Sequence, residues 1–395
     1  MKEKILFVDP SLGNSAGSQK VAINIFDCLV ERYDTSLIMR RGKSQHTDLL
    51  RSHSNSYVSS VFYFPLERVI GKLIGKGSSD ESKKNKFLFF IRLAFVLIVT
   101  NLFVLSMAIK LKPKFVYTYD PRGLVLSSLF LKLFGIKVVW HLHGELHYSS
   151  LMKKIIFSLV SKIIVPSEYI NNQLNSNKSV VLYNGFNYSS VDFVKRKEID
   201  NSQSVNILYV GTLVPHKGIH NIIDSLSKLS VSNQITLNVL GDFIGDYTVS
   251  YKELIIDKIS NLPPNIAVNF NGWVDDPVEF YQDSDVLIFS SVKEQVINID
   301  GKESIIKSSE ALPTVLIESL AYGVPVIASN VAGVSEIVTD NVDGYIVDDS
   351  EPKLLKVSIE KFLFNKGYLK PDPLKTRNKF SFSTMKDCLY NEIEF

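Results

Sequence analysis

The sequence predicts an α/β protein made of two doubly wound domains, and three observations support this fold class. The chain has 395 residues, which is longer than the size at which one hydrophobic core stops growing. Hydrophobic residues make up 45% of it, as is typical of a globular protein. Short apolar segments alternate with helical patterns, lapse into a polar stretch, and then begin again. Such alternation is typical of parallel sheets covered by helices.

The first domain is predicted from the alternation in residues 1–190. Its expected segments are strands at 5–8, 36–39, 114–119, 137–142, 163–166 and 180–183, with helices at 21–30, 87–109 and 151–160. Residues 184–206 are mostly polar, and we interpret them as the linker between domains.

The second domain is predicted over residues 191–370. Its expected segments are strands at 207–210, 236–240, 266–270 and 286–289, helices at 219–229, 251–261 and 277–282, and a loop, helix and strand at 310–329. In parallel sheets of this kind, ligands bind outside the carboxyl ends of the strands.

The segment 310–329 is the most informative part of the chain. Pro313 is expected at the first helical position, because its missing N–H would have no helical partner there. Gly323 is expected to supply the left-handed residue after the last turn. A buried strand follows at Val324–Ser329.

An anion site is expected at the start of this helix. The N–H groups of Thr314, Val315 and Leu316 would lack helical partners there, and the helix dipole favours negative charge. Glu310 lies before this site and Glu318 lies a turn inside the helix. A sugar nucleotide, with a central phosphate group and hydroxyls at both ends, would fit this arrangement. The alternative is that Glu310 is a loop acid and Glu318 only complements the dipole.

The run from Glu310 to Glu318 resembles the donor-binding signature of family 4 glycosyltransferases, which are retaining enzymes of the GT-B fold. This resemblance implies two Rossmann-like domains with a cleft between them and a nucleotide-sugar donor. It implies that Glu310 holds the donor sugar at the catalytic centre and that Glu318 holds the ribose. It also implies that residues 371–395 fold back towards the first domain.

Other segments of the second domain extend the resemblance. Residues 209–218 resemble the phosphate-binding loop of the family, with Gly211 and Lys217 in place and Thr212 where an arginine is usual. Lys217 would meet the donor diphosphate as a point charge, and the alternative is an ordinary surface lysine. Residues 269–274, which include Gly272, resemble the stretch whose backbone meets the nucleotide base.

Four residues of the first domain are candidates for the same site. Gly17 follows the first strand in a loop of small residues that could approach a ligand closely. His143 matches the family histidine that contacts the donor sugar near the reaction centre, and His141 shares its face by strand alternation. Asp120 follows a strand and would orient an acceptor, and His141 is a second candidate on the acceptor side. The alternatives are core histidines and an aspartate that caps the next helix.

A membrane surface is the expected partner of residues 68–114. This stretch holds ten Lys or Arg residues and two acids, a local charge of +8 in a chain of net charge +3. It includes the most apolar run of the chain, 87–109, so we expect an anionic membrane rather than nucleic acid. The helix would lie at the bilayer interface, since crossing would split one sheet across two sides of the membrane. The alternative is a long helix packed on the first sheet.

Few other features bear on the cellular setting. Two cysteines, Cys28 and Cys388, form no disulfide framework, and the N-terminus carries no signal peptide pattern. We therefore expect a cytoplasmic protein, peripheral on the inner face of the plasma membrane. No cluster of metal ligands is apparent, so neither a metal nor another cofactor is expected. Residues 292–309, which include Glu294, are expected to form a polar loop inserted near the donor sugar.

These observations predict a retaining glycosyltransferase that moves a sugar from a nucleotide-sugar donor to a lipid-linked or oligosaccharide acceptor in bacterial surface polysaccharide synthesis, such as capsule, O-antigen or exopolysaccharide. Two alternatives stay open. One is a nucleotide-sugar epimerase on a similar fold, which would need further acids in the cleft. The other is a catalytically silent nucleotide-binding subunit, motivated by Thr212 in place of arginine.

Overall fold

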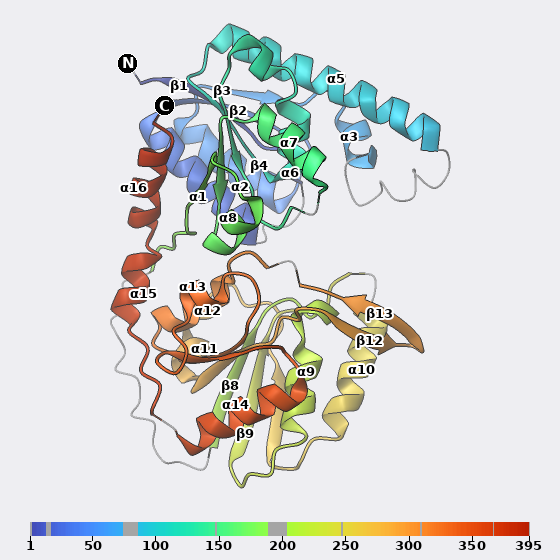
Figure 1. Cartoon of the computed structure of the whole chain (residues 1–395), viewed down its shortest axis with the longest axis vertical. Helices are drawn as coiled ribbons and strands as arrows, with labels where there is room; N and C mark the ends of the chain where they lie inside the picture. The colour runs from blue at the N-terminus through green and yellow to red at the C-terminus, as the bar shows by residue number, and fades with distance from the viewer. Residues whose placement is uncertain are drawn as a thin grey trace. The chain divides into compact units, whose positions relative to one another are not determined.

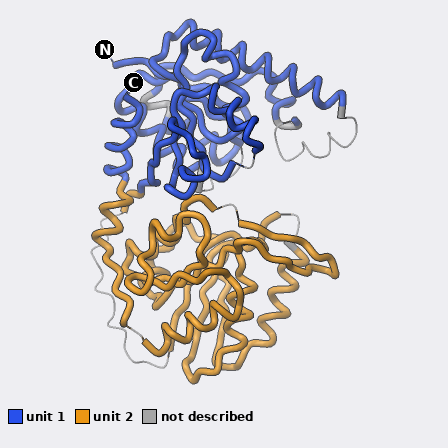
Figure 2. Tube along the Cα trace, viewed as in Figure 1, with its two compact units in different colours: residues 1–185, 382–395 blue, residues 186–381 orange. Residues whose placement is uncertain are grey.

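The computed structural model of the chain describes residues 2–12, 17–73, 86–146, 148–188, 204–245, 248–308, 310–365 and 367–394. The chain divides into two compact units (Figure 2): unit 1 comprises Met1–Gly185 and Phe382–Phe395, and unit 2 comprises Phe186–Ser381. Most of the predicted linker, residues 189–203, lies outside the described residues. Of the predicted C-terminal segment 371–395, only the part from Phe382 onward belongs to unit 1.

Unit 1 is built on a seven-stranded sheet whose order is β3-β2-β1-β4-β5-β6-β7. All neighbouring strands pair in parallel. The strands are β1 (Lys4–Val8), β2 (Asp34–Met39), β3 (Ser60–Tyr63), β4 (Val116–Tyr119), β5 (Val138–His141), β6 (Lys162–Val165) and β7 (Ser179–Val181). The direction of strand order reverses between β1 and β4, and this switch point is where doubly wound sheets bind ligands.

Helices cover the sheet of unit 1 (Figure 1). They are α1 (Gly17–Arg32), α2 (Gln45–Tyr57), α3 (Glu67–Leu73), α5 (Lys86–Leu111), α6 (Asp120–Ser127), α7 (Ser150–Leu159), α8 (Glu168–Leu174) and α16 (Phe382–Glu392), with a short 3-10 helix at Leu131–Phe134. The last helix packs beside α1, because Met385 and Leu389 join the same buried cluster as Phe7 and Phe26. The C-terminal residues thus help to close the core of the first sheet.

Helix α5, which contains the predicted helix 87–109, has two different sides. Val96, Thr100 and Val104 are fully buried, whereas Phe90 and Phe95 are 63% and 59% exposed. Asn101 ties the helix to the end of α6, because its side chain donates to Val125 O at 2.9 Å and accepts from Leu129 N at 2.8 Å. Among the described helices, α5 alone is long and apolar enough to cross a membrane by length and composition.

Unit 2 is built on a six-stranded parallel sheet whose order is β10-β9-β8-β11-β14-β15. The strands are β8 (Ser204–Val210), β9 (Gln234–Leu240), β10 (Ile266–Phe270), β11 (Val286–Phe289), β14 (Val326–Ser329) and β15 (Gly344–Val347). The helices are α9 (Ile219–Leu226), α10 (Thr248–Ser260), α11 (Val278–Asp283), α12 (Thr314–Ala321), α13 (Val334–Ile337), α14 (Pro352–Phe364) and α15 (Pro373–Lys379). The switch point of this sheet lies between β8 and β11.

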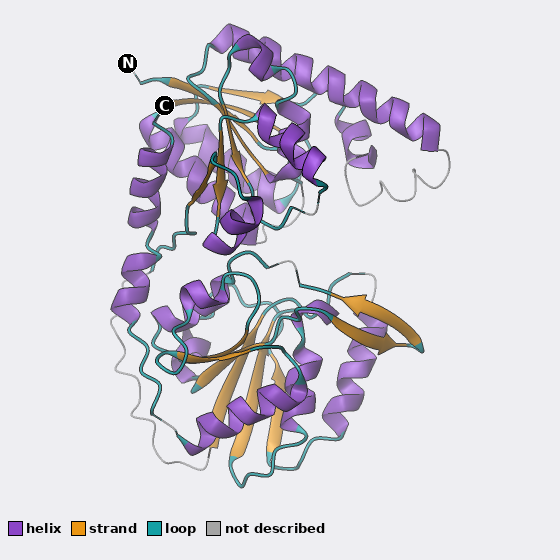
Figure 3. Cartoon of the chain, in the orientation of Figure 1, coloured by secondary structure: helices purple, strands orange, loops and turns teal. Residues whose placement is uncertain are grey.

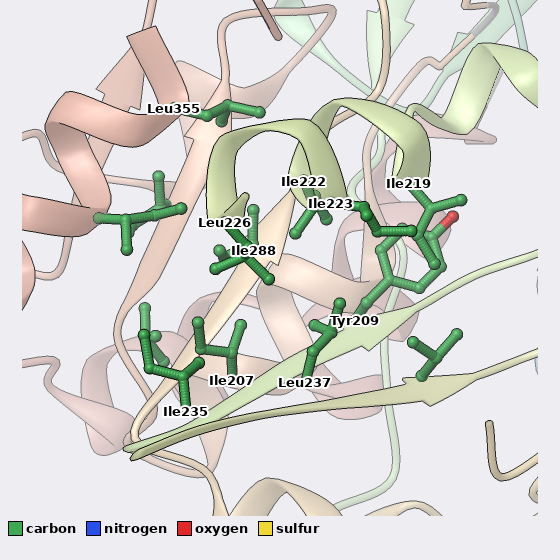
Figure 4. Close-up of a cluster of buried hydrophobic side chains, with 14 of the residues drawn as sticks. Ile207, Tyr209, Ile219, Ile222, Ile223, Leu226, Ile235, Leu237, Ile288 and Leu355 are labelled. Carbon is green, nitrogen blue, oxygen red and sulfur yellow. The ribbon is translucent and has the colours of Figure 1, made fainter. Parts of the chain in front are cut away.

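Alternate residues of these strands form the core of unit 2. Ile207 and Leu237 point from the sheet towards Ile222 and Leu226 of α9, and Leu355 of α14 lies above them (Figure 4). Residues at alternate positions of a strand share one face of the sheet. The packing of these residues against α9 and α14 therefore fixes the orientation of each strand.

The prediction that residues 292–309 form a loop is wrong. The middle of this segment forms an antiparallel hairpin of β12 (Gln295–Ile299) and β13 (Lys302–Ile306), shown as a pair of strands in Figure 3. Asp300 and Gly301 make the turn, with φ of 53° and 73°. Two successive left-handed residues are what a two-residue hairpin turn needs, and Asp-Gly is a preferred pair for it. Ile297 and Ile299 are buried on one side of the hairpin.

Candidate active site

A pocket in unit 2 lies where β8 and β11 end and α12 begins. It brings together most of the residues predicted to bind a donor. Its lining consists of Tyr209, Val210, Gly211, Lys217, Ile288, Phe289, Ser291, Glu310, Pro313, Thr314 and Val315. Gly211, Lys217, Glu310 and the first residues of α12 therefore meet at one place, at the switch point of the sheet.

The loop after β8 holds Lys217 in this pocket. Lys217 ends a 3-10 turn at Pro215–Lys217, and Gly218 follows with φ of 72°. A Cβ on Gly218 would lie 2.0 Å from Ser290 O, so only glycine fits there. Ser290 Oγ donates to Lys217 O at 3.0 Å. These contacts hold the lysine loop against the end of β11.

Glu310 forms an ion pair with Lys217 inside the pocket. Ser291 Oγ also donates to Glu310 Oε1, at 3.1 Å. The side chains of Lys217 and Glu310 are 27% and 16% exposed, so both remain reachable from solvent. A diphosphate entering the pocket would compete with Glu310 for the ammonium group.

The start of α12 differs by one residue from the prediction. Pro313 is the N-cap, with φ of −71° and ψ of 104°, and Thr314 is the first helical residue. The N–H of Leu316, predicted to be free, donates to Pro313 O at 3.2 Å. Thr314 and Val315 line the pocket, so an anion there would face the first turn of the helix. Gly323 has φ of 78°, which confirms the predicted helix stop.

Glu318 is held on another side of α12. Tyr281 of α11 donates its hydroxyl to Glu318 Oε2 at 3.0 Å, and its ring stacks on Tyr322 at 5.4 Å. Burial and the neighbouring carboxylate raise the pKa of Tyr281 well above its usual value, so this hydroxyl stays a donor. Nothing local in the sequence marks Tyr281, which is separated from Glu318 by 37 positions.

Thr212 and Gly272 lie at the ends of β8 and β10. The backbone oxygen of Thr212 accepts from Tyr209 Oη at 3.2 Å, and Gly272 O accepts from Gly241 N at 2.7 Å. Among the described residues, neither they nor Glu318 line the pocket around Lys217.

In unit 1, the switch point between β1 and β4 holds a buried polar cluster that sequence reasoning missed. His46 Nε2 lies 2.7 Å from Asp9 Oδ2, and Tyr119 Oη donates to Asp9 Oδ1 at 3.1 Å. Ser11 N also donates to Asp9 Oδ1, at 2.8 Å. Asp9 and His46 are 1% and 0% exposed. They are 37 positions apart, and no local motif connects them.

His141 and His143 share one face, as strand alternation predicts, with ring centres 4.0 Å apart. Burial lowers the pKa of His143 to about 4 and that of His141 well below its usual value, so both rings are neutral at pH 7. His141 is fully buried, and its Nδ1 lies 2.7 Å from Tyr117 Oη. Direct contact with an acceptor, as predicted for His141, does not fit this burial, and a core histidine beneath His143 does.

Asp120 begins α6 with φ of 62°, a left-handed conformation that aspartate tolerates better than most residues. Arg122 Nη2 lies 2.7 Å from its carboxylate, and Trp140 Nε1 donates to its backbone oxygen at 3.1 Å. Gly17 is the first residue of α1, and residues 13–16 of its predicted loop lie outside the described ranges. In the part of the chain that the structure describes, no group of His, Cys, Asp and Glu residues could hold a metal ion.

The segment of the chain that holds the pocket matches a known protein family. Residues 191–382, nearly all of unit 2, match the family described as Glycosyl transferases group 1. All residues that line the pocket around Lys217 and Glu310 lie within this matched range.

Several curated relatives carry names from the same enzyme class. The chain is 27% identical over 256 residues to an uncharacterized glycosyltransferase of Methanocaldococcus jannaschii, covering 62% of the chain and 63% of that protein. It is 26% identical to the capsular polysaccharide biosynthesis glycosyltransferase CapM of Staphylococcus aureus, again covering 62% and 63%. A lipopolysaccharide 1,2-N-acetylglucosaminetransferase of Salmonella typhimurium is 27% identical over 47% of the chain and 48% of its own length. The chain spans less than two thirds of the length of these relatives.

Solved structures establish the fold over the whole chain. HepE of Anabaena in complex with UDP superposes with a TM-score of 0.71 at 19% identity, covering 98% of both chains. A glycosyltransferase from Rickettsia africae gives 0.73 at 19%, covering 99% of this chain and 97% of that one. The lipopolysaccharide outer core galactosyltransferase WaaB gives 0.69 at 16%, covering 99% of both. The predicted GT-B fold class, with two Rossmann-like domains, is thereby confirmed.

Proposed function

We propose that the protein is a retaining glycosyltransferase that takes a sugar from a nucleotide-sugar donor and transfers it to a saccharide acceptor. One observation carries this proposal. Lys217, Glu310 and the start of α12 line a single pocket, although they come from separate parts of unit 2. A cation and a helix start suit a diphosphate, and a carboxylate beside them suits sugar hydroxyls.

The ion pair suggests how the donor would bind. The diphosphate would take the place of Glu310 on Lys217 and would also face the N–H groups of Thr314 and Val315. Glu310 would then accept hydrogen bonds from the sugar, while Ser291 still orients it. Glu318, oriented by Tyr281, would accept from the ribose hydroxyls.

The same groups would assist departure of the nucleoside diphosphate. Negative charge develops on the leaving group, and donors placed there in advance stabilise it. Lys217 and the start of α12 are suitably placed. We therefore propose that turnover proceeds without a divalent metal or another cofactor, and activity that persists in excess EDTA would support this.

Unit 1 would bind the acceptor, and Asp120 is the side chain proposed to orient it. His143 would contact the donor sugar as a neutral ring, because its pKa is lowered to about 4. Its Nε2 is buried without a hydrogen-bond partner among the described residues, so it has a polar atom to offer.

We also propose that unit 1 rests on the inner face of the plasma membrane and that the acceptor is lipid-linked. The exposed side of α5 carries Phe87, Phe90 and Phe95, which together present a large apolar surface. Basic residues precede and follow this helix in the sequence. The names of relatives in capsule and lipopolysaccharide synthesis support an acceptor of surface polysaccharide assembly.

The decisive test is a screen of purified protein against a panel of nucleotide sugars, with and without lipid-linked acceptors. We expect slow donor hydrolysis with one donor and faster transfer once its acceptor is present. The anomeric configuration of the product, read by NMR, should equal that of the donor. A protein that neither hydrolyses nor transfers any donor would contradict the proposal, and an inverted product would contradict its retaining part.

A further inference from the structure

A buried polar network joins the base of the β12–β13 hairpin to the helix that follows Lys217. Asn221 Nδ2 donates to Gln295 Oε1 at 2.9 Å, and Gln295 Nε2 donates back to Asn221 Oδ1 at 3.2 Å. His220 Nε2 lies 3.3 Å from the same Gln295 oxygen. His220 and Asn221 are only 3% and 1% exposed. Buried amides need such partners, so these contacts define one position for Gln295.

The direction of each hydrogen bond follows from the state of His220. Burial lowers the pKa of His220 to about 4, so the ring is neutral at pH 7 and has one N–H. Gln295 Oε1 can only accept, so the N–H is on Nε2. Nδ1 then accepts from Tyr251 Oη, at 2.8 Å. Asn221 and His220 thus both donate to one oxygen of Gln295.

The other side of the hairpin base leads to the pocket. Ser308 N donates to Val292 O at 2.8 Å, which closes the base of the hairpin. Glu310 N donates to Ser308 Oγ at 3.3 Å. Val292 N donates to His216 O at 3.0 Å, directly before Lys217. The hairpin base is therefore bonded to the segments that carry both members of the ion pair.

We propose that Gln295 is a positioning residue that sets how Lys217 and Glu310 meet in the donor pocket. It touches α9 three residues after Lys217, and it lies in the segment that ends at Glu310. A shift of its amide would move the two charged groups relative to each other. This inference rests on the proposed glycosyl transfer, in which a misplacement of about 1 Å can cost two orders of magnitude in rate.

The test compares Gln295→Glu with Asn298→Asp. Both changes turn an amide into an acid on β12, but Asn298 is exposed and outside the network. In Gln295→Glu the donor to Asn221 Oδ1 is replaced by a second acceptor. We expect kcat for the best donor to fall about ten- to a hundredfold. Binding of UDP or GDP, whichever the wild type binds, should weaken, while binding of the matching nucleoside stays near wild type. Asn298→Asp should match wild type throughout.

Tyr251→Phe provides a second variant should Gln295→Glu fail to fold. It keeps the ring and removes only the hydroxyl that orients His220, and we expect a smaller fall in kcat with unchanged nucleoside binding. Wild-type kcat in both folded variants would overturn the inference. So would losses of nucleoside and nucleoside diphosphate binding that are equal, because these would indicate general damage to unit 2. If wild type itself turns over no donor, the proposed function is wrong. If wild type and both variants are equally active, the proposed function stands and only the inference about Gln295 is wrong.

Discussion

The two units place polar clusters at the same point of the same topology, yet the clusters differ in kind. In each sheet the cluster lies where strand order reverses, between β8 and β11 in unit 2 and between β1 and β4 in unit 1. Lys217 and Glu310 are opposite charges that remain partly exposed. Asp9 and His46 are sealed, and His143 is kept neutral by burial. An ion pair that remains partly exposed can exchange one partner for a ligand, whereas a fully buried hydrogen-bonded pair such as Asp9 and His46 mainly supports its surroundings. We therefore expect the largest losses of activity from changes at Lys217 and Glu310, and mainly losses of stability from changes at the buried Asp9 and His46.

The largest effect is expected for Glu310→Gln. The amide keeps the shape of the side chain and loses the charge, so transfer should fall by at least about a hundredfold. Nucleoside diphosphate binding should be retained, because Lys217 is no longer engaged by a carboxylate. Turnover and calorimetry measure the two effects. Glu294→Gln is the matched control, since Glu294 is an exposed acid just before the hairpin. Wild-type turnover in Glu310→Gln would show that the partly exposed pair of unit 2 does not serve the reaction.

A second difference between the units is the membrane contact proposed for unit 1. Lys83, Lys84 and Lys86 come just before Phe87 in the sequence, and each lysine near an anionic surface contributes about 1 kcal/mol. Replacing all three with Glu should release the protein from anionic vesicles. High salt should also weaken binding, since surface charge is screened beyond about 10 Å at 0.1 M. Co-sedimentation at low and high salt measures this.

The apolar part of this binding has its own matched control. Phe90→Ser with Phe95→Ser should weaken vesicle binding, whereas Phe364→Ser, at a phenylalanine of unit 2 that is 80% exposed, should not. Wild-type protein that stays in the supernatant with anionic vesicles at low salt would show that α5 serves only the fold of unit 1.

A smaller effect is expected for Lys217→Ala. Nucleoside diphosphate binding should weaken by about 1.5–3 kcal/mol, the contribution of a hydrogen bond to a charged group. The free nucleoside lacks phosphates and should bind almost as it does to wild type. Lys293→Ala, at an exposed lysine just before the hairpin, should change neither affinity. Equal losses for both ligands would mean that Lys217 acts through the fold of unit 2.

Much of the fold was predictable from local patterns, because apolar strands and amphipathic helices alternate along both units. The hairpin at β12 and β13 was missed although its signals were present. Alternating residues flank Asp300-Gly301, which is a strong hairpin signal. The polar character of the segment outweighed that signal and led to a predicted loop. One face of the hairpin is exposed, and polar residues on that face do not argue against a strand.

The candidate sites were predictable to different extents for a physical reason. The loops that form the pocket of unit 2 need glycine or proline for their backbone conformation. Gly218, Gly323 and Pro313 therefore show in the sequence where these loops lie. The buried cluster of unit 1 has no such markers. Asp9 follows β1 and His46 lies in α2, and only the folded structure brings them within 2.7 Å of each other. A long-range pair of this kind leaves no periodic or turn signal in the sequence.

The smallest effect, on stability, is expected for His143→Gln and depends on pH. The pKa of His143 is about 4 in the folded protein, against 6.5 as the ordinary value. Below pH 6.5 His143 is therefore protonated in the unfolded chain but stays neutral in the folded protein. The free energy of unfolding falls as the pH falls from 6.5 to 4. The contribution of His143 to stability is fully present above pH 6.5. A glutamine does not titrate, so only wild type should lose stability through this ionisation. The free energy of unfolding of wild type, relative to that of the variant, should therefore fall by about 1–2 kcal/mol between pH 7.5 and pH 5. Melting curves of both proteins at the two pH values measure this, and parallel losses of Tm would contradict it.

The pH profile of kcat provides a second measurement. An ionisation between pH 6 and 7 that is present in wild type and absent from the variant would show that His143 titrates during turnover. His143 would then exchange a proton during the reaction, against the neutral hydrogen-bonding role proposed for it.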